Sequence, residues 1–330
     1  MNEDFPPPAE PSATVPAAST TGPTRRFTVT TPDGATLAAQ VMGPASAPES
    51  APPLLLLPGQ ANSHHWWDAV RPGYAAAFRT ITFDYRGTGD STGPEQTGTG
   101  AGAVGEPGRA GRSAGHSSRP AWSMRTFAED AACVLAAAGY AASPVAVFGT
   151  SMGGRVAQEL ALLRPELVGA LVLACTGPGG AHEVRSPAGV GHRLLEASGA
   201  DKRRVLFELF YSPVWPGEPA DSTLLGDPGM TAAARSAHLR ASRRHDAWER
   251  LPRIGVPTLV LHGEADLMCP VDNARVLAER IPGARVRTYP QGRHGFFEEF
   301  SARVTPDVVE FLAGCNLAGC NADAPARRYL

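Results

Sequence analysis

The sequence predicts an α/β protein: a doubly wound, mostly parallel β-sheet with a helical cap inserted between two of its strands. Short, continuously apolar segments recur along the chain, and such segments are typical of strands buried on both faces. Helix-like stretches alternate with them, which favours parallel strands with helices on both faces of the sheet. Hydrophobic residues make up 43% of the 330 residues, enough for a sizeable core.

The predicted sheet opens with an antiparallel hairpin. Two strand-like runs, residues 27–31 and 37–42, flank the turn residues Pro32, Asp33 and Gly34. Six further strands are expected to lie parallel, at residues 54–57, 80–83, 145–148, 167–174, 258–261 and 285–289. The helices predicted among them span residues 126–138, 152–163, 271–280 and 305–313.

Several segments depart from this alternation. Residues from about 92 to 120 are mostly Gly, Ser, Pro, Ala and Arg, which predicts a flexible insertion. Neutral padding is favoured over a regulatory or partner-binding role. Two helix-like stretches, 202–211 and 232–244, fall between two strands, where a cap over an active site would be inserted. The predicted divisions are a disordered N-terminal tail, a core in two parts, a helical cap and a C-terminal tail: residues 1–24, 25–177 with 251–314, 178–250 and 315–330.

Charge and composition exclude several classes of partner. The formal charge is −2 and the arginines are scattered, so no basic stripe for nucleic acid is present. No apolar run approaches the ~20 residues that cross a bilayer, and the first 20 residues do not resemble a signal peptide. Cys315 and Cys320 form a lone pair with too few ligands for a metal site. We therefore expect a cytoplasmic protein without metal, membrane or nucleic-acid partners.

The strongest local signal is the run Gly149-Thr150-Ser151-Met152-Gly153 between a predicted strand and a predicted helix. A serine on such a sharp turn has a strained backbone and exposes its hydroxyl at the carboxyl edge of the sheet. The glycines allow close approach of neighbouring backbone, and the helix N-terminus favours developing negative charge. This context predicts Ser151 as a nucleophile, against the alternative of an idle serine in a Gly-rich turn.

A serine nucleophile needs a base, and the base needs an acid to orient it. Asp266 follows the strand at 258–261 and His294 follows the strand at 285–289, so both are expected at the same sheet edge as Ser151. Glu264 is the close rival for the acid, and His262 is expected to be structural. The other histidines are expected at the surface: His64, His65, His116, His182, His192, His238 and His245.

Two backbone N–H groups are needed to bind the oxyanion that forms during acyl transfer. One is expected from Met152, the residue after the nucleophile. The other is expected from Gln60, in the loop after the strand at 54–57, because Pro58 in that loop has no N–H.

These blocks, in this order, resemble the α/β-hydrolase superfamily over roughly residues 27–313 without the Gly-rich insertion. The turn at residues 84–91, with the pattern D-x-R-G-x-G-x-S, adds to the resemblance, and its role in the family is structural. Many relatives carry His-Gly before the oxyanion donor, where this chain has Pro58-Gly59. The chain looks closest to bacterial esterases, enol-lactonases and cofactor-free haloperoxidase-like hydrolases.

The resemblance implies a serine hydrolase of the ester-bond class (EC 3.1.1) that cleaves a small-molecule ester or lactone through an acyl-enzyme, without a cofactor. Branches of the fold that cleave C–halogen bonds or epoxides use Asp where this chain has Ser151. Phe210 and Trp215, in an aromatic run of the cap, are expected to contact substrate, although packing of the cap explains the run equally well. The alternatives are a lyase or C–C bond hydrolase with the same three residues, or a ligand-binding receptor.

Overall fold

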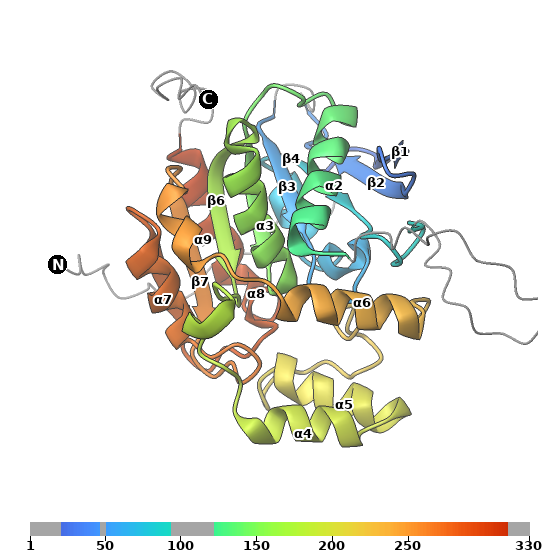
Figure 1. Ribbon diagram of the computed structural model, residues 1–330, viewed down its shortest axis with the longest axis vertical. Helices are drawn as coiled ribbons and strands as arrows, with labels where there is room; N and C mark the ends of the chain where they lie inside the picture. Colours follow the sequence, from blue (N-terminus) through green and yellow to red (C-terminus); the bar gives the residue numbers. More distant parts are fainter. Residues whose placement is uncertain (1–20, 47–50, 94–121, 316–330) are drawn as a thin grey trace, which may run out of the picture.

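The computed structural model describes residues 21–46, 51–93 and 122–315, which form one eight-stranded sheet with helices on both faces (Figure 1). The strand order is β1-β2-β4-β3-β5-β6-β7-β8. β1 pairs antiparallel with β2, and β2 with β4, whereas every other neighbouring pair is parallel. The predicted fold class and opening hairpin are confirmed.

All eight predicted strands form, with small differences at their ends. Their bounds are β1 Arg25–Thr30, β2 Thr36–Met42, β3 Pro53–Leu57, β4 Arg79–Phe83, β5 Val145–Thr150, β6 Val168–Ala174, β7 Thr258–Gly263 and β8 Arg285–Tyr289. Leu167, predicted to open β6, instead ends a 3-10 turn at Pro165–Leu167. β5 and β7 run two residues beyond their apolar segments, so the residues that follow them stand at the carboxyl edge of the sheet.

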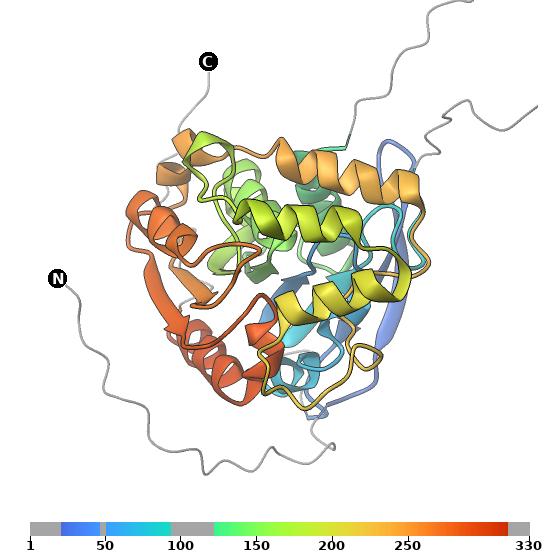
Figure 2. The ribbon, with the colours of Figure 1, turned by 90° about the horizontal axis from the view of Figure 1, so that it is seen from below.

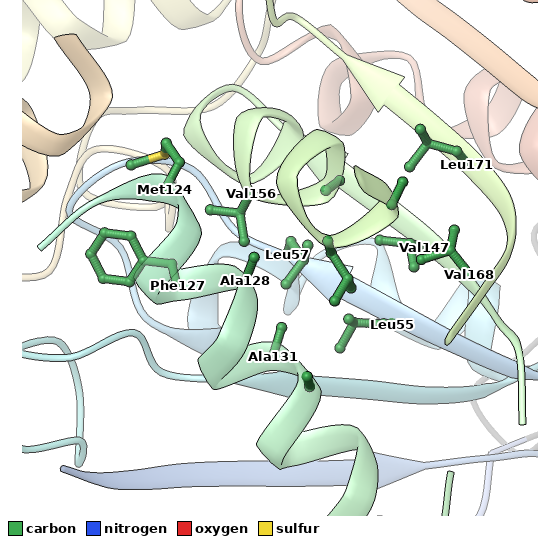
Figure 3. Close-up of a cluster of buried hydrophobic side chains, with 14 of the residues drawn as sticks. Leu55, Leu57, Met124, Phe127, Ala128, Ala131, Val147, Val156, Val168 and Leu171 are labelled. Atoms are coloured by element: carbon green, nitrogen blue, oxygen red, sulfur yellow. The ribbon is translucent and has the colours of Figure 1, made fainter. Parts of the chain in front are cut away.

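The sheet alternates its side chains between two hydrophobic layers. Leu55 and Leu57 of β3 point toward α2 (Met124–Ala137) and α3 (Met152–Leu163), in the cluster drawn in Figure 3. Leu54 and Leu56 point to the other face, where the short helix α1 (Arg71–Ala75), α8 (Phe296–Glu299) and α9 (Ser301–Ala313) pack. The period of two along a strand buried on both faces explains its continuous apolar sequence.

The helices match the predictions less closely than the strands. α3 has the predicted bounds, and α7 (Asp272–Arg280) begins one residue late. α9 begins at Ser301, four residues before the predicted start, because Val304 in its first turn is fully buried against the core. Within the described ranges, no helix is both long and apolar enough to span a membrane.

Three helices lie between β6 and β7 and gather at one end of the molecule, which Figure 2 views from below. They are α4 (Ala188–Glu196), α5 (Gly199–Phe210) and α6 (Ala232–Arg243). α5 and α6 were predicted and α4 was not: its sequence is amphipathic, but its nine residues include two glycines, Gly189 and Gly191, which are poor helix formers. We call residues 178–250 the inserted segment; the exact division between core and cap remains a prediction.

Parts of the predicted divisions fall outside the described residues. These are residues 1–20 of the N-terminal tail, 94–120 of the Gly-rich insertion, and the C-terminal tail beyond Cys315, including Cys320.

A buried ion pair joins the opening hairpin to the helical layer. Arg86 is 3% exposed and donates to Asp130 of α2, from Nε to Oδ2 at 2.6 Å and from Nη2 to Oδ1 at 2.5 Å. Asp33, in the turn between β1 and β2, accepts from the same guanidinium, and this hydrogen bond lowers the pKa of Asp33 to about 2. The D-x-R-G turn therefore has the structural role that the resemblance implied.

Removing the buried partner of Arg86 should destabilise the protein. We expect Asp130→Ala to lower the free energy of unfolding by about 3 kcal/mol, because it leaves a buried guanidinium with one partner fewer. Urea denaturation measures this change. The matched control is Glu129→Ala, one residue earlier on α2, whose exposed side chain should contribute less than about 0.5 kcal/mol. Equal losses in the two variants would contradict this account.

Candidate active site

Ser151 sits between the end of β5 and the start of α3 with φ 53° and ψ −120°. This conformation is costly for a residue with a Cβ and persists only where the surroundings hold it. Its backbone N–H donates to the carbonyl of Ala174 at the end of β6, at 2.9 Å. The turn thus has the strained geometry that the sequence pattern predicted.

The two glycines that flank Ser151 are required by close backbone contacts. A Cβ on Gly149 would lie 2.2 Å from the carbonyl oxygen of Gly153, within the turn itself. A Cβ on Gly153 would lie 2.2 Å from the carbonyl oxygen of Leu57 on β3. No side chain fits at either position, so β3, β5 and α3 approach closely only because both residues are glycine.

Ser151, His294 and Asp266 form a continuous series of hydrogen bonds. Ser151 Oγ lies 3.0 Å from His294 Nε2, and His294 Nδ1 lies 2.8 Å from Asp266 Oδ2. His294 is 2% exposed and Asp266 is 3% exposed. With Nδ1–H donating to the carboxylate, the lone pair of Nε2 faces the serine hydroxyl, which is the arrangement that general-base catalysis requires.

The Asp266 carboxylate is oriented by the loop that follows β7. Its Oδ1 accepts two backbone hydrogen bonds, from Met268 at 2.8 Å and Cys269 at 2.9 Å. His262, buried at the end of β7, donates from Nε2 to the carbonyl of Cys269 at 2.7 Å and so holds the same loop. Glu264 is exposed and accepts from Thr288 Oγ1 at 2.7 Å, so the structure does not bring this rival acid to His294.

The inserted segment forms backbone hydrogen bonds with the loop that carries His294. The backbone N–H of His294 donates to Leu209 at 3.2 Å, and that of Gly295 donates to Phe210 at 2.7 Å. These carbonyls end α5, where helices leave such groups without intrahelical partners. The ring of Phe210 also packs edge-on against His294, with 5.0 Å between centroids. The sequence predicted Phe210 near the site but gave no signal for these backbone bonds.

Trp215, the other predicted substrate-contacting residue, lies two rings farther from His294 than Phe210 does. It stacks on Tyr211 with 5.2 Å between centroids, and Tyr211 in turn contacts Phe210 at 6.5 Å. The two residues therefore belong to one aromatic series that begins at the His294 ring.

The loop after β3 lies beside the Ser151 turn because β3 pairs with β5, with Leu57 opposite Gly149. Gln60 is in this loop, and Met152 is the first residue of α3. Within the described part of the chain, neither backbone N–H donates a hydrogen bond. Trp66 covers Gly59 and donates from Nε1 to Thr150 Oγ1 at 2.8 Å, which fastens the loop to the residue before Ser151.

Two of the histidines expected at the surface are buried, so that prediction was wrong for them. His238 is 0% exposed and His245 is 4% exposed. Burial lowers the pKa of both below the usual value for histidine, and that of His238 to about 4. The reason is that α6 and the residues after it pack onto the core rather than stand apart from it. His116 lies outside the described residues.

Among residues 21–46, 51–93 and 122–315, no group of three or more His, Cys, Asp or Glu side chains is arranged to hold a metal ion. A cavity of about 390 Å³ between β7, β8 and α9 contains neither Ser151 nor its hydrogen-bonded partners.

Comparisons with known proteins identify similar sequences. A family model described as "Serine aminopeptidase, S33" matches residues 74–301. The putative carbamate hydrolase RutD of Azorhizobium caulinodans is 31% identical over 269 residues, which cover 79% of this chain and 90% of that protein.

Solved structures show the same similarity. A hydrolase from Pseudomonas aeruginosa PA01 aligns with a TM-score of 0.66 and 26% identity, over 87% of this chain and 98% of that one. The esterase RhEst1 from Rhodococcus sp. ECU1013 aligns with a TM-score of 0.67 and 25% identity, over 88% of this chain and 98% of that one.

The close contact between Gly153 and the β3 backbone predicts an effect of substitution on stability. Gly153→Ala should lower the free energy of unfolding by about 1–3 kcal/mol, because the new Cβ meets the β3 backbone and forces it to move. Gly189→Ala is the matched control: its Cβ meets nothing within 4 Å, on the exposed helix α4. It should leave stability unchanged or raise it slightly. If Gly153→Ala proved as stable as the wild type in urea, this packing argument would be wrong.

Proposed function

The chain belongs to the α/β-hydrolase family described as Serine aminopeptidase, S33, and we propose that it hydrolyses a carboxylic ester or lactone of a small molecule. The observation that carries this proposal is the series of hydrogen bonds from Ser151 through His294 to Asp266. A serine hydroxyl becomes a useful nucleophile when a positioned base takes its proton, and this series supplies both the base and the group that orients it.

In the proposed reaction, Ser151 Oγ attacks the substrate carbonyl while His294 Nε2 takes the hydroxyl proton. Asp266 holds the Nδ1–H and stabilises the imidazolium that forms. His294 then protonates the leaving alcohol, and the acyl group remains on Ser151. A water molecule, deprotonated by His294, attacks the acyl-enzyme and releases the acid. The cycle needs no redox step.

The tetrahedral intermediate carries a negative oxygen, and we assign its binding to the backbone N–H groups of Met152 and Gln60. Met152 directly follows Ser151, and Gln60 lies in the loop after β3, which the β3–β5 pairing brings beside the Ser151 turn. Neither N–H donates to another acceptor among the described residues. Preorganised donors of this kind are the largest single contribution in many acyl-transfer enzymes.

The apolar surroundings of His294 favour substrates with an apolar group beside the scissile carbonyl. Phe210 lies against His294 and meets Trp66 edge-on, with 5.8 Å between centroids. We propose that Phe210 and Trp215 contact this apolar group. An extended hydrocarbon or aromatic acyl chain would bury its surface against these rings.

A carbamate is the second candidate substrate, because the relative from Azorhizobium caulinodans is named a putative carbamate hydrolase. A carbamate carbonyl accepts the same attack by Ser151, so geometry alone does not separate the two. A panel of p-nitrophenyl esters, lactones, carbamates and aminoacyl p-nitroanilides separates ester hydrolysis from carbamate and peptide cleavage. Turnover of a C–C bond substrate, or tight ligand binding without turnover, would instead favour the lyase-type or receptor alternatives.

Ser151→Ala should abolish hydrolysis. We expect kcat/KM for the best ester of the panel to fall by about 10⁴–10⁶-fold, because the residual rate comes only from binding and the oxyanion donors. Steady-state release of p-nitrophenol measures the change. The control is Ser198→Ala, an exposed position whose side chain makes no cap hydrogen bond. Equal turnover by wild type and Ser151→Ala would refute the proposed mechanism.

Asp266→Asn tests which acid orients the base. We expect kcat to fall by about 10⁴-fold, because an amide holds the imidazole in the wrong tautomer. The paired variant Glu264→Gln removes the neighbouring exposed carboxylate and should retain wild-type kcat. If Glu264→Gln lost activity and Asp266→Asn kept it, the acid would be misassigned.

A further inference from the structure

His238, on α6 of the inserted segment, is completely buried. Both of its ring nitrogens form hydrogen bonds with backbone groups of the core. Its Nδ1 lies 3.4 Å from the backbone nitrogen of Ala61, and its Nε2 lies 2.9 Å from the carbonyl oxygen of Arg86. A backbone N–H can only donate and a carbonyl can only accept. The ring is therefore the neutral tautomer with its proton on Nε2.

The surroundings of His238 keep this ring neutral. Phe127, Trp122 and Tyr85 pack edge-on around it, at 5.0, 5.8 and 6.1 Å between centroids. Burial among these rings lowers the pKa of His238 to about 4. A protonated ring would have no lone pair for the Ala61 N–H, so the low pKa preserves the contact at neutral pH.

Ala61 directly follows Gln60 and is itself in the left-handed region, with φ 58°. The peptide that joins them is held at both ends: His238 accepts from the Ala61 N–H, and Asn62 Nδ2 donates to the Gln60 carbonyl at 3.2 Å. The next carbonyl, of Ala61, accepts from the backbone of Asp227 at 2.8 Å. Since a peptide is planar, these bonds fix the orientation of the Gln60–Ala61 peptide and restrict ψ of Gln60. The Gln60 N–H belongs to the preceding peptide and is held indirectly, through the Cα of Gln60.

Asn62 forms a second set of hydrogen bonds between the Gln60 loop and the inserted segment. It is 3% exposed, accepts from the Gly226 N–H at 3.2 Å, and donates to the Leu224 carbonyl at 3.3 Å. The loop that carries Gln60 is thus held from residues 224–238, outside the sheet, and its strained alanine conformation depends on those contacts.

We propose that His238 is a positioning residue for the oxyanion hole, and that through Ala61 it holds the Gln60 N–H toward the substrate carbonyl oxygen. The proposal rests on the hydrolase function proposed above. It gives the inserted segment a part in transition-state binding besides covering the site.

Three variants separate the two hydrogen bonds of His238. His238→Phe keeps an aromatic ring and removes both bonds. His238→Asn places an acceptor near the position of Nδ1, and His238→Gln places a donor near the position of Nε2. We expect kcat for a p-nitrophenyl ester to fall by about 10²-fold in the Phe and Gln variants, because a misplaced donor acts mainly in the transition state. KM should change little, and Asn should recover most of kcat.

A trifluoromethyl ketone provides a second readout, because it adds to Ser151 and forms a tetrahedral oxyanion. Its affinity should fall in the Phe and Gln variants by the same factor as kcat/KM, as expected for an analogue that uses the same donors. The control Leu277→Ala removes core packing on α7, away from the site, and should lower the melting temperature without changing kcat at 25 °C. If His238→Phe does not fold, the difference in kcat and ketone affinity between His238→Asn and His238→Gln tests the proposal.

The outcomes are distinct. Wild-type turnover together with unchanged kcat and ketone affinity in the Phe or Gln variants would overturn the role of His238. So would a change confined to KM, or an equal loss of kcat in Leu277→Ala. A wild type that neither hydrolyses the panel nor binds the ketone would instead overturn the proposed function, and this inference with it.

Discussion

The left-handed backbone of Ser151 is the constraint on which the rest of the site depends. A serine at φ 53° costs of order 1–3 kcal/mol, so other contacts must hold it there. The bond from its N–H to Ala174 and the side-chain-free positions Gly149 and Gly153 do so, because they let α3 begin against the β3 backbone. This conformation aims the hydroxyl at His294 and leaves the Met152 N–H free at the helix start. The proposed nucleophile and one proposed oxyanion donor thus follow from one turn.

The helices of the inserted segment lie together at one end of the molecule (Figure 2), and the segment is hydrogen-bonded to two loops of the candidate site. The end of α5 accepts hydrogen bonds from the loop of His294, and residues 224–238 hold the loop of Gln60. Both loops lack regular structure and would move if they were held only by the strands before them. On the proposed function, the rings assigned to substrate contact and the loops of His294 and Gln60 therefore belong to one connected unit. A change in the inserted segment would reach the proposed chemistry through these hydrogen bonds.

The features that could be predicted from the sequence are those with a signal in neighbouring residues. Every strand and the Ser151 turn were predicted, since apolar runs and flanking glycines signal them directly, and the placement of Asp266 and His294 at strand ends followed from the parallel sheet. Two features of the structure were not predicted: the helix α4 and the burial of His238. α4 is short and contains two glycines, which are poor helix formers. His238 was assigned to the surface because its burial depends on residues distant in the sequence, the Gln60 loop and the rings of Tyr85, Trp122 and Phe127. No local pattern distinguishes such a histidine from a solvated one.

Covalent labelling determines whether Ser151 is the nucleophile of a hydrolase. The full-length protein is treated with a fluorophosphonate, which reacts with serines activated by a neighbouring base, and the modified peptide is identified by mass spectrometry. We expect one adduct, on Ser151, formed in step with the loss of esterase activity and absent when His294 is replaced by alanine. Modification of a different residue in step with inactivation, or full activity after complete labelling of Ser151, would contradict this assignment.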